Sequence, residues 1–103
     1  MKNRIEDLLA QLTLEEKVSL IAGVDLWHTA AVSRLGIPAI KMSDGPVGAR
    51  GAGGDSGPAS VCFPCGVALA ASWNTDLVQQ VGEALALETR AKGASILLAP
   101  TVN

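Results

Sequence analysis

The chain has 103 residues, of which 49% are hydrophobic and 17% are charged, and its formal net charge is −2. This composition is too apolar for a disordered chain, and the length suffices for one hydrophobic core. No block of like charge indicates a nucleic-acid partner or a membrane surface. The longest uncharged run, residues 56–75, is interrupted by glycine and proline, so it does not predict a transmembrane helix.

Two short amphipathic helices are predicted at the start of the chain. Asn3 with Glu6, and Thr13 with Glu16, have the spacing of a capping box, and Gly23 is a suitable stop for the second helix. The apolar residues after each box recur at helical spacing, and we expect them to be core: Ile5, Leu8, Leu9, Leu12, Leu14, Val18 and Ile21. The polar residues before them lack the apolar core of a secretory signal, which favours a cytoplasmic protein.

A strand is predicted near residues 39–42, followed by a glycine-rich, exposed loop at residues 45–60. The apolar run at residues 67–71 is interpreted as a second short, buried strand. Ser95 to Ala99 reads as a further strand, and because its residues do not alternate with polar ones it should be buried on both faces.

A long helix is predicted between the last two strands. Asn74 or Thr75 caps it and Gly93 ends it, while Glu88 and Lys92 stand four residues apart in the order that favours an ion pair. Apolar strands joined through a helix favour a parallel α/β sheet. A buried parallel strand needs neighbours on both sides, so we expect these residues to be the first part of a larger domain.

Asp44 is the candidate binding residue. It follows the predicted strand directly, at the carboxyl end where α/β folds bind ligands. Gly45 and Gly48 allow a tight turn and Pro46 restricts it. A carboxylate on a stiff turn can accept hydrogen bonds from two neighbouring hydroxyls, as on a sugar. Arg50 could orient this carboxylate or hold the loop. The alternative is that Asp44 only closes the turn through its own backbone.

Several segments resemble glycoside hydrolase family 3, the β-glucosidase family, in the family's order. They are LTLEEKVSLIAG, DLWHT, RLGIPAI, IPAIKMSDGPVGARG, FPCGVALAASWN and ETRAKGASILLAPTVN, which together span nearly the whole chain. The resemblance implies an α/β fold, the N-terminal part of a TIM-like (β/α)8 barrel that is incomplete in this chain. It also implies that residues 1–103 belong to the barrel domain, without the remainder of the barrel or the family's second, α/β-sandwich domain.

By this resemblance the parent enzyme would be a retaining β-glucosidase acting on terminal, non-reducing β-D-glucosyl residues of β-glucosides or cello-oligosaccharides. Asp44 would bind hydroxyls of the glucose in the −1 subsite. The nucleophile and the acid/base would lie outside the chain, so the chain alone should be inactive and prone to aggregate. No metal or organic cofactor, nucleic acid or membrane is implied.

Trp27 and Arg50 are further candidates by the same resemblance. A tryptophan in the loop of Trp27 lines the +1 subsite in some relatives, and indole faces suit the apolar faces of pyranose rings; the alternative is a partly buried core tryptophan. Arg50 matches a family position, where it would support the loop. His28 is interpreted as structural.

Cys62 and Cys65 support a rival hypothesis, a thiol-disulfide redox module, because Cys62-Phe63-Pro64-Cys65 has the C-x-x-C spacing. A thioredoxin-type motif should open a long helix, whereas here we expect a short apolar run after Gly66. A metal site of the usual kind would need more ligands than these two cysteines. A non-catalytic interaction fragment is a third possibility, since the chain lacks the catalytic carboxylates.

Overall fold

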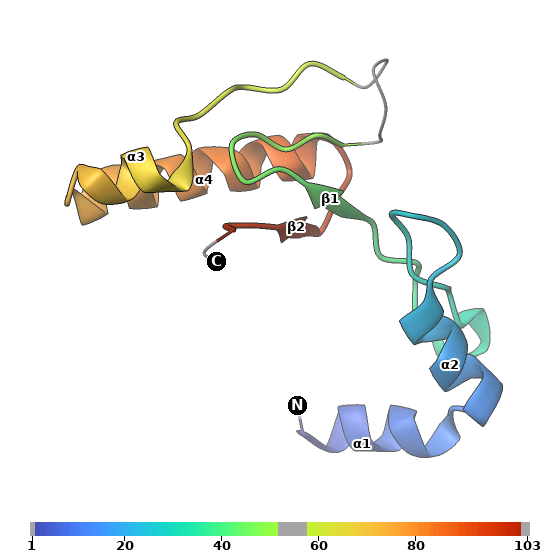
Figure 1. Cartoon of the computed structure of the whole chain (residues 1–103). Coiled ribbons are helices and arrows are strands. Elements are labelled where there is room, and N and C mark those ends of the chain that lie inside the picture. The colour runs from blue at the N-terminus through green and yellow to red at the C-terminus, as the bar shows by residue number, and fades with distance from the viewer. Residues whose placement is uncertain (1, 52–57, 102–103) are drawn as a thin grey trace. The chain divides into compact units, whose positions relative to one another are not determined.

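The computed structural model describes residues 2–51 and 58–101, with side chains from Arg4 onward. The chain divides into two compact units, Met1–Ile40 and Lys41–Asn103, and each is described by itself (Figure 1). Residues 52–57 of the predicted loop, and the Asn3 side chain of the first predicted capping box, lie outside the described part. None of the described helices combines the length and the apolarity needed to cross a bilayer.

The first unit contains helices α1 (Lys2–Gln11) and α2 (Leu14–Ala22) and the short 3-10 helix η1 (Ser33–Leu35). The predicted capping box of α2 is confirmed. The Thr13 hydroxyl accepts a hydrogen bond from Glu16 N at 3.2 Å, and Thr13 N donates to Glu16 Oε2 at 2.9 Å. Gly23 ends the helix at φ 74°, and its N–H donates to Ser19 O.

Arg34 ties these three helices together. Its Nε donates to Glu16 Oε1 at 2.7 Å, and its Nη2 donates both to Glu16 Oε2 and to Gln11 O at the end of α1. The hydrogen bonds from Arg34, together with that from Thr13 N, lower the pKa of Glu16 to about 2 against a small opposing effect of desolvation. A bidentate arginine therefore fixes the helical corner of the first unit.

The expectation that the apolar stripe of α1 and α2 forms a core is wrong for most of its members within this chain. Leu12 is buried, but Ile5 is 62% exposed, Leu14 73% and Ile21 88%. Two short helices and their connections supply too little chain to cover both apolar faces. The helical period predicts which residues share a face, but burial of that face depends on what packs against it.

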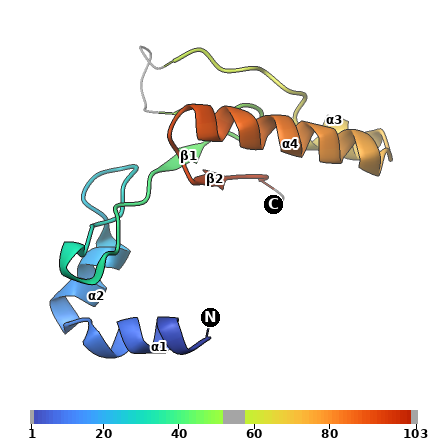
Figure 2. The same cartoon turned by 180° about the vertical axis from the view of Figure 1, so that it is seen from behind.

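The second unit contains strand β1 (Met42–Asp44), helices α3 (Gly66–Ala71) and α4 (Thr75–Ala91), and strand β2 (Ile96–Leu98). The two strands pair in parallel, with Met42 opposite Ile96 and Asp44 opposite Leu98. Figure 2 shows α4 running beside this pair, and α4 contacts β2. The predicted parallel strands joined through a helix are thus confirmed. Asn74 caps α4 by accepting a hydrogen bond from Leu77 N at 3.0 Å.

Three predictions for this unit are corrected. The first strand lies at Met42–Asp44 and not at residues 39–42. Residues 67–71 belong to helix α3, because Ala68 N and Leu69 N both donate to Cys65 O and alanine has the highest helix propensity. A short apolar run has no period that separates a strand from a helix. Strand β2 is not buried on both faces, since a sheet of two strands leaves Ile96 42% exposed.

Candidate functional site

Asp44 is the last residue of β1, as the sequence predicts, and the chain turns back on itself directly after it. Gly45 and Gly48 have φ angles of 142° and 157°, which favour glycine. A Cβ atom at Gly45 would lie 1.8 Å from Gly48 O, and one at Gly48 would lie 1.9 Å from Val61 O. Only glycine fits either position. The backbone of this turn, residues 44–51 and called the corner below, is therefore closely packed.

One backbone hydrogen bond and one bond to a serine hydroxyl close the corner at its start and at its end. Arg50 N donates to Asp44 O at 2.8 Å, and Gly51 N donates to the Ser43 hydroxyl at 2.9 Å. The Ser43 hydroxyl in turn donates to Asp44 O at 2.8 Å, and Ser43 is 0% exposed. The carbonyl of Asp44 is therefore held by two donors, which restrains the residue that carries the candidate carboxylate.

The prediction of an exposed loop is wrong for part of residues 45–51, whereas Pro46, Arg50 and the described residues 58–60 are exposed as predicted. Gly45, Gly48, Ala49 and Gly51 are all buried, and Ala49 is 0% exposed. The returning segment also pairs with the corner, since Phe63 N donates to Val47 O at 2.6 Å. Glycine-rich composition predicts tight turns, but here the turns pack under a second segment of chain.

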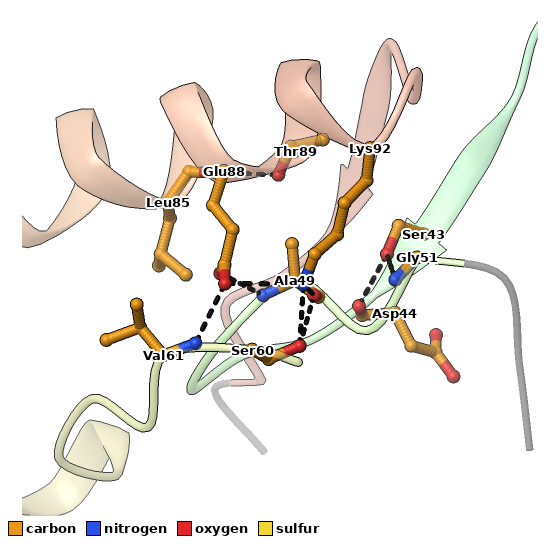
Figure 3. A network of polar contacts seen from close by, with 10 residues as sticks. All are labelled: Ser43, Asp44, Ala49, Gly51, Ser60, Val61, Leu85, Glu88, Thr89 and Lys92. Atoms are coloured by element: carbon orange, nitrogen blue, oxygen red, sulfur yellow. Dashed lines mark hydrogen bonds and ion pairs between the residues drawn. The ribbon is translucent and has the colours of Figure 1, made fainter. Parts of the chain in front are cut away.

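Two side chains hold the corner from the other side, Glu88 of α4 and Lys92 directly after this helix (Figure 3). Glu88 accepts hydrogen bonds from Ala49 N at 2.7 Å and from Val61 N at 2.8 Å. Lys92 Nζ donates to Ala49 O and, at 2.7 Å, to the Ser60 hydroxyl, which itself donates to Ala49 O at 2.6 Å. The predicted pair of Glu88 and Lys92 is confirmed at 3.3 Å. Glu88 thus binds the N–H of Ala49, and Lys92 and Ser60 bind its carbonyl.

The pKa of Glu88 is shifted by opposing effects. Desolvation raises it, but the hydrogen bonds from Val61 N, Ala49 N and Lys92 outweigh that effect and leave the pKa below its ordinary value. The side chains of Glu88 and Lys92 are only 14% and 10% exposed. Glu88 is therefore a charged acceptor within the packed corner, where such hydrogen bonds are strongest.

The Asp44 carboxylate itself stands apart from this network. Figure 3 shows it pointing away from Glu88 and Lys92, and within the described ranges it forms no hydrogen bond or ion pair. The Asp44 carbonyl accepts the hydrogen bond that closes the turn, as the alternative expects, whereas the Asp44 carboxylate takes no part in the closure. The binding role of this carboxylate therefore stays a prediction. Asp44 is half-buried. A fixed, partly accessible carboxylate with free lone pairs can accept hydrogen bonds from a ligand.

Arg50 supports the corner through its backbone. Its N–H binds the Asp44 carbonyl, whereas its exposed guanidinium forms no ion pair with Asp44 or with any other residue among those described. Any residue other than proline could supply this backbone hydrogen bond, so both interpretations of the Arg50 side chain stay predictions.

Trp27 belongs to the first unit and lies in a loop that Asp25 organises. Asp25 Oδ1 accepts hydrogen bonds from Trp27 N at 2.7 Å and from His28 N at 2.8 Å, and His28 Nδ1 lies 2.9 Å from Asp25 Oδ2. The hydrogen bond from Trp27 N is the main cause that lowers the pKa of Asp25. His28 therefore has a structural role, as predicted. Trp27 is half-buried, and its proposed contact with sugar stays a prediction.

Cys62 and Cys65 are free and exposed. The apolar run after Cys65 forms helix α3 and not the expected strand, but α3 has only six residues, and the long helix begins at Thr75, as predicted. A thioredoxin-type motif opens a long helix, so the redox hypothesis is not favoured. Among the described residues no three potential ligands of the His, Cys, Asp and Glu types gather in one place.

An apolar hollow of about 460 Å³ lies between α3, α4 and β2. Its lining includes Leu69, Val78, Leu85 and Leu97, and Asp44 is not part of it. A sugar site needs polar groups that converge on hydroxyls. The hollow is therefore distinct in character from the surface around the Asp44 carboxylate.

Glu88 and Ser43 are the residues that sequence reasoning missed. The sequence signals Glu88 only through its spacing from Lys92, whereas its partners Ala49 and Val61 lie 39 and 27 residues away. No sequence pattern indicates the role of Ser43, because a serine within a predicted strand does not by itself indicate burial or a hydrogen-bond partner. The glycine pattern is the most informative signal in the sequence. It predicts that the backbone packs closely here, but it does not identify the segment that packs against it.

Residues 6–103 match the sequence model of the glycosyl hydrolase family 3 N terminal domain. A β-glucosidase of Rhizobium radiobacter is 53% identical over 96% of this chain, which covers 12% of that protein. A crystal structure of a β-glucosidase from Kluyveromyces marxianus in complex with glucose is similar with a TM-score of 0.92 and 46% identity, over 96% of this chain and 12% of that one.

A more distant β-glucosidase from Thermotoga neapolitana, also in complex with glucose, has a TM-score of 0.80 at 34% identity, over 97% of this chain and 17% of that one. The chain thus spans about an eighth of the length of the first two relatives. These likenesses confirm the fold class predicted from the sequence, the N-terminal part of a TIM-like barrel that is incomplete in this chain.

Proposed function

Because the chain belongs to glycosyl hydrolase family 3, we propose that the complete protein containing it is a glycosidase that hydrolyses β-glucosides. The names of its relatives support this reaction, and the glucose in two of their crystal structures supports the sugar. The 103 residues contribute the first part of the barrel in this proposal. Further domains, the oligomeric state and the preferred aglycone are not part of it.

The role proposed for this chain is to hold the sugar through Asp44. The observation that carries it is a carboxylate at the end of a parallel strand, fixed by a closely packed corner and free of partners within the described residues. Ligands bind at this end of the strands in parallel α/β folds. A carboxylate offers two oxygens to neighbouring hydroxyls, and hydrogen bonds to a charged acceptor are worth roughly 1.5–3 kcal/mol each.

The reaction proposed is hydrolysis of terminal, non-reducing β-D-glucosyl residues with retention of configuration. Two carboxyl groups about 5 Å apart then act as nucleophile and as acid/base. In this proposal neither group belongs to the 103 residues, so Asp44 is neither the nucleophile nor the acid/base. Hydrogen bonds from the sugar hydroxyls to Asp44 that strengthen in the oxocarbenium-like transition state would lower the barrier. Trp27 would line the +1 subsite of cello-oligosaccharides.

The test is the substitution Asp44→Ala, with Asp44→Asn as the variant that preserves shape, in the complete protein. Losing two hydroxyl contacts should lower kcat/KM on an aryl β-glucoside by about 100-fold or more, at 1.4 kcal/mol for each factor of ten. The thermal unfolding midpoint should change little, because the Asp44 carboxylate takes no part in closing the corner. Asp76→Asn, on the exposed first turn of α4, is the matched control. Unchanged kcat/KM in the Asp44 variants would reject the role.

A further inference from the structure

We propose that Glu88 is a positioning residue for Asp44, which sets the geometry in which the enzyme holds its sugar. This inference rests on the proposed function. Glu88 lies on α4 and belongs to a corner that its carboxylate helps to build, whereas the Asp44 carboxylate points out of that corner (Figure 3). Its effect on the substrate is therefore indirect.

The carboxylate of Glu88 joins two segments of chain that are far apart in sequence. Oε2 accepts from Ala49 N at 2.7 Å, in the segment that leaves Asp44, and Oε1 accepts from Val61 N at 2.8 Å, in the returning segment. Both partners are backbone N–H groups, so both need an acceptor. A carboxylate supplies two acceptors, whereas the amide of glutamine would turn its NH2 group towards one of these donors.

Ala49 transmits the position of α4 to Asp44 through a short, rigid path. The next residue, Arg50, donates its N–H to the carbonyl of Asp44 at 2.8 Å. Each peptide group is planar, and Ala49 is 0% exposed in a closely packed environment. A displacement of Ala49 must therefore move its neighbours along the chain. A shift at Glu88 therefore reaches the Asp44 backbone across a single residue.

Lys92 and Ser60 hold the other polar group of Ala49, its carbonyl. The Lys92 ammonium also binds the Ser60 hydroxyl at 2.7 Å. Glu88 lies in the last turn of α4 and Lys92 is the C-cap residue directly after it, so the end of this helix presents an acceptor and a donor to one residue, Ala49, at a fixed spacing. The position of the corner is thus fixed by a rigid helix and not by a loop.

The consequence for catalysis follows from where Asp44 acts. Hydrogen bonds that strengthen in the transition state depend steeply on geometry, and a misplacement of about 1 Å can cost about 100-fold in rate. A disturbed corner should therefore lower kcat more than it raises KM. A purely structural role of Glu88 predicts instead a loss of folded protein with normal kinetic constants per folded molecule.

The experiment is a double-mutant cycle in the complete protein, with Glu88→Gln, Asp44→Asn and the two combined. We expect Glu88→Gln to lower kcat/KM on an aryl β-glucoside by about 10- to 100-fold, mostly through kcat. In the Asp44→Asn background the same change should cost less than about threefold, because the residue through which it acts is already lost. Glu83→Gln is the control, because Glu83 is exposed on the same helix and its hydrogen bond within the described ranges is to Gln79; this variant should stay within about twofold of the wild type.

Ser60→Ala is the milder variant should Glu88→Gln fold poorly, since it removes one hydrogen bond to Ala49 and should show the same non-additivity with Asp44→Asn. Additive losses in the cycle, or normal kcat/KM in Glu88→Gln, would overturn this inference alone and leave the proposed function standing. A wild-type protein that hydrolyses no aryl β-glucoside would instead overturn the proposed function, and this inference with it.

Discussion

Gly45→Ala should distort the corner after β1 far more than an ordinary replacement of glycine. The new methyl group would lie 1.8 Å from Gly48 O, and since real contacts of this kind do not fall below 3.0 Å, the carbonyl must move by about 1.2 Å. Alanine at φ 142° adds backbone strain of about 1–3 kcal/mol. A shift of that size would also break the bond from Ala49 N to Glu88, at a further cost of about 1.5–3 kcal/mol.

Strain and the lost hydrogen bond together should cost about 2.5–6 kcal/mol. Gly36→Ala is the control that introduces strain without the steric clash. Gly36 also has a positive φ, 67°, but a Cβ atom there meets nothing within 4 Å. Its replacement should therefore cost only the strain of about 1–2 kcal/mol. The assay is the urea unfolding midpoint of both variants of the complete protein, together with kcat/KM. Gly45→Ala should lie clearly lower in both quantities, and equal midpoints for the two variants would refute the reasoning from the corner.

Two further outcomes are expected. Because Arg34 holds the pKa of Glu16 at about 2, below its ordinary 4.5, their pair stabilises fully above pH 4.5 and is lost as the pH falls through about 2. The difference in urea midpoint between wild type and Glu16→Gln should therefore shrink towards pH 2, and a constant difference would contradict the pairing. Replacing Cys62 and Cys65 together by serine should leave kcat/KM unchanged with or without a reductant, whereas lost activity would restore the redox hypothesis.

Local patterns in the sequence predicted much of the fold. The capping box at Thr13 and the cap at Asn74 are confirmed because each depends on a side chain and a backbone group three residues apart. The parallel strands were readable from apolar runs separated by a helix, and their order placed Asp44 at the end of a strand. Helix α3 was missed because five apolar residues satisfy a strand and a helix equally well.

Burial and the polar network were decided only by the tertiary structure. The sequence shows that Glu88 can pair with Lys92, but not that it binds Ala49 and Val61, which lie 39 and 27 residues away. Likewise the glycines after Asp44 predict a tight turn without revealing that it is packed under a second segment. Spacing along the chain encodes interactions within a turn or a helix, whereas contacts between distant segments exist only once the chain has folded and brought their backbone groups within hydrogen-bonding distance.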